Sequence, residues 1–224
     1  MSTAVPVAAV VPFYNGRDFV RAAIESILGQ EAPPAEIVVV DDGSTDGGAD
    51  LVAGLPGVRV VRQANGGEAA ARNRGIRETT APLLAFLDQD DLWLPRKLAL
   101  QVAALAADPG LDFVFAQHRI FAEEGARWFR RDALDRVLTA ELPGTLLVRR
   151  SAFDRIGLFR EALRLGSDVD WVLRARDAGL RSRPVEEVLL LRRMHVANSS
   201  IDESRFMAGL LDAARASVRR KRSS

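Results

Sequence analysis

Three carboxylates stand within four positions of this chain, directly after an apolar run. The run 83–87 has the length and composition of a buried central strand, and Asp88, Asp90 and Asp91 follow it. Carboxylates this close repel one another and raise each other's pKa unless a cation lies between them. Hard oxygen ligands suit Mg²⁺ or Mn²⁺, so the cluster favours a divalent metal site. A simpler interpretation is that one acid caps the next helix and the others face water.

Strand and helix patterns alternate along the first half of the chain. The sequence predicts strands at residues 5–11, 36–40, 58–61, 83–87 and 111–116, separated by turn residues and helical spacing. This order is typical of an α/β fold with a mainly parallel sheet and helices on both faces.

Polar residues gather at the ends of these predicted strands. Tyr14 and Asn15 follow the first strand, Asp42 follows the second, and the acidic triplet follows the fourth. Because ligands of parallel sheets bind beyond the carboxyl ends of the strands, we expect these residues to share one site. No G-x-G-x-x-G follows the first strand, and the sequence contains no G-x-x-x-x-G-K-[ST]. Both of these glycine-rich motifs hold the phosphates of a nucleotide, and both are absent. For a site that binds a nucleotide diphosphate, a metal held by carboxylates therefore remains as the way to neutralise its charge.

The composition excludes several classes of function. The 224 residues are 48% hydrophobic, and a net charge of +1 gives no field that would recruit nucleic acid. Cysteine is absent, which excludes disulfides and thiolate metal sites. The first residues lack a basic n-region, and no run reaches the roughly 18 apolar residues of a membrane span. We therefore expect a cytoplasmic protein without a nucleic-acid partner.

Four motifs occur in order along the first half: PFYN at 12–15, VDDGSTD at 40–46, NGGEAAARNRG at 65–75 and FLDQDD at 86–91. Together they resemble a family 2 glycosyltransferase, an inverting enzyme with the GT-A fold. The resemblance implies a nucleotide-diphosphate-sugar donor, which we expect to be uridine-based, and Mn²⁺ or Mg²⁺ as cofactor. It also implies an acceptor that is a carbohydrate or a lipid-linked molecule, as in polysaccharide biosynthesis.

The resemblance assigns roles to the residues at the strand ends. Asp42 would contact the base, Asp88 would lie near the ribose and the metal, and Asp90 would coordinate the metal. The implied nucleotide-sugar site comprises Pro12, Tyr14, Asn15, Asp42, Arg72, Asp88 and Gln89. The implied metal ligands are Asp88, Asp90, Asp91 and His195. For Arg72, the spacing alone favours an exposed charge on a helix surface.

The sequence GSDVDW at 166–171 is a second group of acids. On its own, the pattern favours Ser167 or Asp168 as the cap of the helix that follows. The resemblance instead implies that Asp168 is the catalytic base, which takes the proton of the acceptor hydroxyl as the new bond forms. The family more often has Glu where this chain has Ser167, and Asp170 is the second candidate for the base.

Acceptor contacts are expected mainly from the second half of the chain. The residues assigned to the acceptor side are Trp93, Thr145, Asp170 and Trp171. The sequence around His195, R-x-H followed by Asn198, resembles the family's late motif, in which His approaches the metal or the diphosphate. For His118 we expect a structural role.

We expect one GT-A domain over residues 1–224. It would comprise a nucleotide-sugar-binding half (1–117), an acceptor and catalytic half (118–200), and a C-terminal helix with a basic tail (201–224). The tail pattern favours a helix packed on the domain. A second hypothesis is that its basic end docks on the inner face of an anionic membrane, near a lipid-linked acceptor.

Two other functions stay open. A sugar nucleotidyltransferase shares the sheet architecture but should carry a Gly-rich loop with Arg or Lys after the first strand, where PFYNGRD supplies one Gly and one Arg. The second is a protein that binds a nucleotide sugar without catalysis and acts as the partner of another enzyme. The presence of Ser167, where the family more often has Glu, is compatible with this function.

Overall fold

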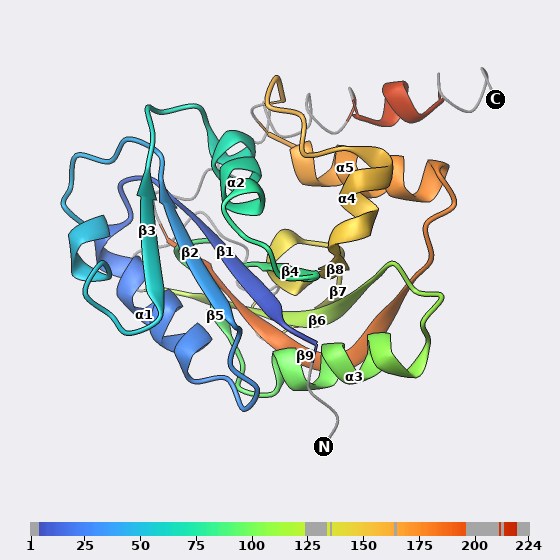
Figure 1. Ribbon diagram of the computed structural model, residues 1–224, viewed down its shortest axis with the longest axis horizontal. Coiled ribbons are helices and arrows are strands. Elements are labelled where there is room, and N and C mark those ends of the chain that lie inside the picture. The colour runs from blue at the N-terminus through green and yellow to red at the C-terminus, as the bar shows by residue number, and fades with distance from the viewer. Residues whose placement is uncertain are drawn as a thin grey trace.

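One sheet organises the chain (Figure 1). The computed structural model describes residues 5–123, 134, 136–163, 165–195, 211 and 213–218. Its strands are β1 (Val7–Phe13), β2 (Glu36–Asp41), β3 (Val58–Arg62), β4 (Leu83–Phe86), β5 (Leu92–Trp93), β6 (Phe113–Ala122), β7 (Val137–Thr139), β8 (Leu147–Arg149) and β9 (Ser182–Met194). Its helices are α1 (Arg17–Leu28), α2 (Glu68–Arg77), α3 (Lys97–Ala107), α4 (Arg150–Ile156) and α5 (Ser167–Asp177), with 3₁₀ turns η1 (Ala49–Leu51) and η3 (Pro143–Thr145).

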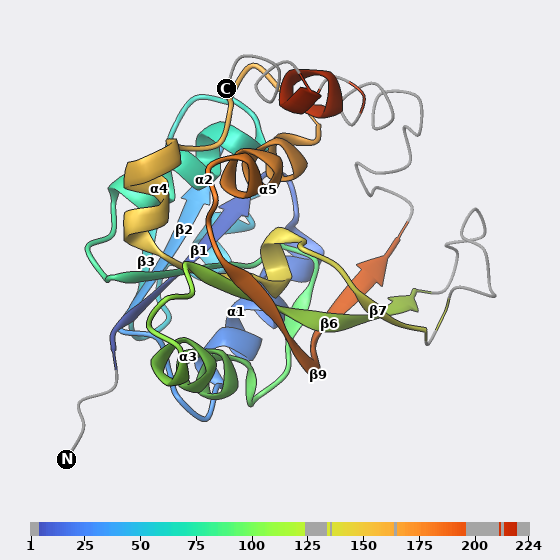
Figure 2. The same ribbon diagram turned by 90° about the vertical axis from the view of Figure 1, so that its right-hand side faces the viewer.

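Helices cover both faces of the sheet. α1 and α3 lie on one face, and α2, α4 and α5 lie on the other (Figures 1 and 2). Each face has its own apolar cluster, and β1 contributes to both: Val7, Ala9 and Val11 belong to one, Ala8 and Val10 to the other. Because every residue of β1 is buried, its sequence is a continuous apolar run. The predicted α/β fold with helices on both faces is confirmed.

The strand order over the described residues is β3-β2-β1-β4-β8-β6-β9-β5, with β7 paired to β6. β1 to β4 are parallel, as the sequence predicts. The fifth predicted strand corresponds to β6, but β8 lies between β4 and β6 and is antiparallel to both. β5 and β7 were not predicted, because two or three residues carry no detectable period.

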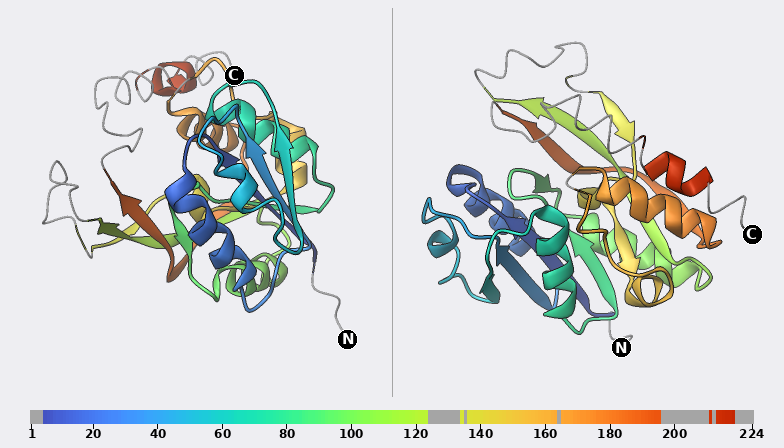
Figure 3. Two further views of the ribbon diagram at one scale, coloured as in Figure 1. Left: turned by 90° about the vertical axis from the view of Figure 1, so that its left-hand side faces the viewer. Right: turned by 90° about the horizontal axis from the view of Figure 1, so that it is seen from above.

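β9 links the outer part of the sheet to the acidic triplet. It pairs in parallel with β6, and this ribbon, with β7 at its edge, projects beyond the rest of the sheet (Figures 2 and 3). Near its end β9 also pairs with β5, where Leu92 meets Leu191 and Trp93 meets Leu190. The acids that precede β5 are thereby set beside the last residues of β9.

His118 is buried in β6, which agrees with a structural role. Burial, and then the positive charge of Arg192, lower its pKa to about 4, against a hydrogen bond with the backbone of Leu138. The imidazole is therefore neutral at pH 7.

Part of the predicted tail helix packs beside α5. Residues 213–218 are helical, Ala213 is buried, and Ser217 Oγ lies 3.0 and 2.8 Å from the two carboxylate oxygens of Asp177. The remainder of the predicted helix and its basic end lie outside the described residues. Among the helices that are described, none combines the length and apolar character needed to cross a membrane.

Gly75 allows α2 to pack directly on β1. A Cβ at this position would overlap the side chain of Val10, which is fully buried. We expect Gly75→Ala to lower the free energy of unfolding by about 2 kcal/mol, although alanine is the better helix former by roughly 1 kcal/mol.

Urea unfolding measures this difference. Gly54→Ala is the matched control, since a Cβ at Gly54 would meet nothing within 4 Å, and it should change stability by less than about 0.5 kcal/mol. Equal stability of Gly75→Ala and the wild type would show that α2 can move away from β1 at no cost.

Candidate active site

A cleft of about 540 Å³ opens where β1, β2 and β4 end. It is lined by nine of the residues predicted to bind nucleotide sugar or metal: Pro12, Tyr14, Asn15, Asp42, Asp88, Gln89, Asp90, Asp91 and His195. The structure therefore brings together side chains from four distant stretches of the chain, as the strand-end argument predicts.

The loops after β1 and β2 hold each other in place. Asn15 has a positive φ of 47°, a conformation that Asn adopts more readily than most residues. Its Oδ1 accepts a hydrogen bond from Thr45 N at 2.9 Å, and its own N–H donates to Ser44 Oγ at 3.0 Å. Tyr14, next to Asn15, remains about half-exposed where it lines the cleft.

Asp42 lines the cleft but is only 2% exposed. Its Oδ1 accepts hydrogen bonds from Gln63 Nε2 at 2.7 Å and Gly66 N at 2.9 Å, and its Oδ2 accepts one from Gly67 N at 2.8 Å. Gly67 has a φ of 91°, which favours glycine. A carboxylate oxygen can accept two hydrogen bonds, so Oδ2 keeps one further acceptor position.

Arg72 is buried, so its interpretation as an exposed surface charge is wrong. The guanidinium donates to Asp88 Oδ1 at 2.7 Å and to the carboxylate of Glu68. Burial lowers the pKa of Arg72, but the negative charges of Glu68, Asp88 and Asp168 together raise it above its ordinary value. Arg72 is therefore a permanent cation that ties Asp88 to α2.

The acidic triplet meets the end of β9. His195 Nε2 lies 2.9 Å from Asp90 Oδ2, and Arg193 N donates to Asp91 Oδ1 at 2.8 Å. Burial, and then the charge of Asp88, raise the pKa of Asp90, and burial raises the pKa of Asp91 well above its usual value. The crowding of negative charge expected from the sequence is thus present.

The side-chain amide of Gln89 hydrogen-bonds to the protein backbone and is not available to a ligand. Its Oε1 accepts from Tyr14 N at 2.7 Å, and its Nε2 donates to Tyr14 O at 3.1 Å. The amide lies against Gly16, where a Cβ would overlap it. Gln89 therefore joins the acidic turn to the loop after β1, and its contribution to the cleft is to position that loop.

Asp168 lies in the first turn of α5 without capping it. Gly166 occupies the cap position, and no side chain makes a capping hydrogen bond, so the capping interpretation is wrong. The side chain of Asp168 makes no hydrogen bond or ion pair within the part of the chain that the structure describes. Partial burial is the main cause that raises the pKa of Glu68 to about 7; Arg72 opposes it, and Asp88 and Asp168 add to it. Asp168 is not among the residues that line the cleft.

The family model for glycosyl transferase family 2 matches residues 8–165, well over half of the chain. The chain belongs to glycosyl transferase family 2. An uncharacterized glycosyltransferase of Rickettsia felis is 31% identical over 214 residues, which cover 87% of this chain and 35% of that protein. The succinoglycan biosynthesis protein ExoU of Rhizobium meliloti is 32% identical, over 81% of this chain and 60% of ExoU. This chain thus spans 35% and 60% of these two relatives.

Two solved structures share the fold at low identity. The mannosyltransferase PcManGT of Pyrobaculum calidifontis, in complex with GDP-Man and Mn²⁺, matches with a TM-score of 0.75 and 21% identity, over 97% of this chain and 65% of that one. TarS 1–349 of S. aureus, in complex with UDP, matches with a TM-score of 0.69 and 20% identity, over 93% and 65%. The GT-A fold predicted from the sequence is therefore confirmed.

The cleft contains side chains of the types that bind divalent metals. Asp88, Asp90 and His195 bring carboxylate oxygens and an imidazole nitrogen to one cleft, and these ligands suit Mn²⁺ or Mg²⁺. In the described residues, no three such side chains are already gathered as a metal cage. Asp88 is instead paired with Arg72, and Asp91 with the backbone of Arg193.

Trp93 and Thr145 are interior residues, and the expectation that they contact an acceptor is corrected. Trp93 Nε1 donates to Gly144 O at 3.1 Å, and Thr145 Oγ1 donates to Ala140 O at 2.7 Å. Lys97 Nζ lies 4.3 Å from the centroid of the Trp93 ring, and burial lowers the pKa of this lysine well below its usual value. Both residues hold the turn before β8.

Asp170 and Trp171 are also buried, so their acceptor-side assignment is corrected as well. Asp170 accepts from Arg174 Nε at 2.8 Å and from Arg160 at 3.2 Å, which engages both carboxylate oxygens and argues against a role as a second base. Trp171 packs against three aromatic rings, those of Phe113, Phe153 and Phe159.

Several cleft residues were not singled out from the sequence. They include Phe19, Asn65, Glu68, Arg192 and Arg193. Phe19 has the spacing of a core helix residue, yet its ring centroid lies 4.3 Å from that of His195. Arg193 could have been found as the Arg of R-x-H. The predicted late-motif residues 198–200 lie outside the described residues.

Gly16 and Gln89 should affect stability in a strongly non-additive way. Gly16→Ala places a methyl group where the Gln89 amide lies, so we expect it to displace that side chain at a cost of about 1–2 kcal/mol. Gln89→Ala removes the same hydrogen bonds and should cost a similar amount. In the Gln89→Ala background, Gly16→Ala should cost less than about 0.5 kcal/mol. A double-mutant cycle by urea unfolding measures the coupling, and purely additive effects would contradict it.

Proposed function

We propose that this chain transfers a hexosyl group from a nucleoside-diphosphate sugar to an acceptor hydroxyl, with inversion at the anomeric carbon. Family 2 membership supports glycosyl transfer. Uridine is the base we propose, with Mn²⁺ or Mg²⁺ as the cofactor. TarS was solved with UDP and PcManGT with GDP-Man and Mn²⁺, so donors with either base belong in the test. We propose a carbohydrate or a lipid-linked molecule as the acceptor.

The observation that carries this proposal is the unengaged carboxylate of Asp168. No cap, hydrogen bond or ion pair occupies it in the described ranges, whereas the neighbouring Asp170 is held by two arginines. A carboxylate with both oxygens available can take the proton of a hydroxyl placed against it, which typically contributes 10²–10⁴-fold to the rate. Its electrostatic effect on Glu68 and Arg72 supports a place next to the donor cleft.

The donor would occupy the cleft of about 540 Å³. The half-exposed ring of Tyr14 offers a surface for the base, and Asp42 keeps an acceptor position for a base N–H. Arg72 fixes Asp88 for the ribose. Arg192 lines the cleft, and its side chain makes no hydrogen bond or ion pair with the residues described, so its guanidinium is available for the diphosphate.

In the reaction, the acceptor oxygen attacks the anomeric carbon while Asp168 takes its proton, and the bond from that carbon to the diphosphate oxygen breaks. A single base on the face opposite the leaving group gives inversion. A divalent ion held by Asp88, Asp90 and His195 would neutralise the charge on the departing diphosphate. Residues 1–117 would then supply most of the donor site, and residues 118–200 would supply the base together with Arg192 and His195.

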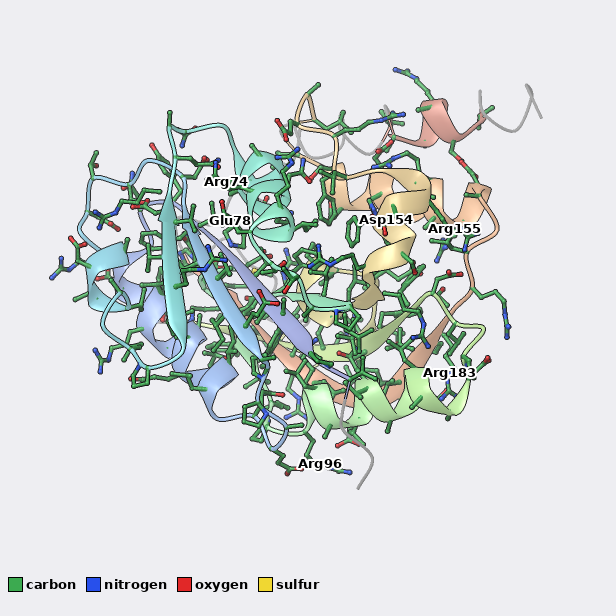
Figure 4. The ribbon with its side chains drawn as sticks, viewed as in Figure 1. Arg74, Glu78, Arg96, Asp154, Arg155 and Arg183 are labelled. Atoms are coloured by element: carbon green, nitrogen blue, oxygen red, sulfur yellow. The ribbon has the colours of Figure 1, made fainter. Side chains whose placement is uncertain are left out.

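Asp168→Asn removes the proton acceptor and keeps the size of the side chain. We expect sugar transfer to fall by about 10²–10⁴-fold while the affinity for the nucleotide sugar stays within about threefold. A transfer assay and calorimetry with UDP-sugars and GDP-sugars measure the two quantities. Asp154→Asn, an exposed carboxylate of α4 labelled in Figure 4, is the control and should behave as wild type. Wild-type transfer by Asp168→Asn would remove the base assignment.

Asp90→Ala should uncouple donor binding from the metal. For the wild type we expect Mn²⁺ to strengthen binding of the nucleoside diphosphate by at least about tenfold, because the ion neutralises adjacent negative charge. EDTA should reverse this gain. For Asp90→Ala, calorimetry with and without Mn²⁺ should give nearly equal affinities, and Asp154→Ala should keep the wild-type response. A Mn²⁺ effect of undiminished size in Asp90→Ala would refute its role as a ligand.

Two outcomes would redirect the proposal. Synthesis of a nucleotide sugar from a nucleoside triphosphate and a sugar phosphate would indicate a sugar nucleotidyltransferase. Tight donor binding without transfer or hydrolysis in the presence of Mn²⁺ would indicate a non-catalytic partner of another enzyme.

A further inference from the structure

Helix α2 carries two consecutive buried polar side chains that reach different parts of the protein. Arg72 donates to Asp88 at the cleft. Asn73, which is 1% exposed, faces the segment between α4 and α5. Neighbouring residues on a helix point roughly 100° apart, so one rigid turn contacts both regions.

Asn73 uses its whole carboxamide on this segment. Its Oδ1 accepts from Phe159 N at 3.0 Å, and its Nδ2 donates to Phe159 O at 2.8 Å. Nδ2 also donates to Glu161 Oε1 at 2.8 Å, so both amide donors are satisfied. The ring of Phe159 lies beside the same helix, with its centroid 5.8 Å from the guanidinium carbon of Arg72.

The same segment is fastened to α5. Arg174 donates to Leu158 O at 2.7 Å and, through Nε, to the Asp170 carboxylate at 2.8 Å. Asn73 is therefore connected, through the buried residue Phe159 and its neighbour Leu158, to the helix whose first turn carries Asp168.

We propose that Asn73 is a positioning residue that fixes the Asp168 carboxylate relative to the donor-binding groups held by α2. This inference rests on the proposed function, in which Asp168 is the base. A base displaced by about 1 Å can cost about 100-fold in rate, because proton transfer requires hydrogen-bond reach. Asn73 does not line the cleft, so its loss should change the rate of transfer and leave donor affinity intact.

Two variants at this position test the proposal. Asn73→Ala removes all three hydrogen bonds, and Asn73→Asp keeps only the one from Phe159 N and places a second carboxylate against Glu161. We expect the single-turnover rate, with the nucleotide sugar on which the wild type is most active, to fall about 10–100-fold in both. The affinity for UDP with Mn²⁺ should stay within about threefold, since Asp42, Asp88 and Arg72 are untouched.

Hydrogen exchange supplies a readout that does not depend on activity. Backbone amides in residues 157–163 and 165–168 should exchange about tenfold faster in both variants, while those in residues 40–46 should be unchanged. A residue that serves only global stability would instead speed exchange throughout the chain and lower affinity and rate together.

Arg74→Ala is the matched control on the same helix. Arg74 points to the surface, where it pairs with Glu78 (Figure 4). Its loss weakens α2 without touching the segment between α4 and α5, so rate and exchange should match the wild type. Glu161→Gln keeps both hydrogen bonds to Phe159 and should lower the rate by less than about threefold.

Wild-type transfer by a folded Asn73→Ala or Asn73→Asp protein would overturn the proposal, as would a parallel loss of rate and affinity. If Asn73→Ala does not fold, the transfer rate and donor affinity of Asn73→Asp test the proposal. The proposed function fails separately: wild-type transfer by Asp168→Asn removes the base itself. Slow transfer by Asp168→Asn with normal transfer by the Asn73 variants refutes the positioning role alone.

Discussion

The antiparallel pairing of β5 with β9 is the contact on which the cleft depends. It comprises two residue pairs, yet it sets Asp90 against His195, which are 105 positions apart in the chain. Closing so long a loop costs conformational entropy. The cost is met by the neighbouring contacts, since β9 pairs along most of its length with β6 and the ring of Trp93 is buried beside Lys97. The two-residue pairing of β5 with β9 is sufficient because β9 is already held by its longer pairing with β6.

Helix α2 explains why the stretch NGGEAAARNRG has its composition. The two glycines present backbone N–H groups to Asp42, and one of them requires a positive φ. Ala71 and Gly75 are small because the helix packs closely against the sheet. Arg72 and Asn73 are polar although buried, since each has partners in a different neighbouring segment. A helix of ten residues with a weak apolar stripe is thus held by specific contacts more than by its hydrophobic face.

The sequence was most informative where a local pattern reports directly on burial. The strands β1, β2 and β4 are built on apolar runs, and the polar residues at their ends meet in one cleft because parallel strands share a direction. The sequence was least informative where burial depends on distant partners. From the sequence, Asp170 was the second candidate for the base, but in the structure Arg174 and Arg160 occupy its carboxylate. Trp93 was assigned to the acceptor side, but its indole N–H donates to Gly144 O in the interior. β5 was not predicted because its two residues form a strand only through their pairing with β9, which is distant in the sequence.

The close approach of Gly16 to the Gln89 amide has a consequence beyond this molecule. The side chains at these two positions compete for one small volume, although the positions are 73 apart in the chain. Positions 16 and 89 should therefore vary jointly among natural variants of this chain. Glycine should persist at position 16 wherever position 89 keeps a long side chain. A larger residue should arise at position 16 only after the side chain at position 89 has become shorter.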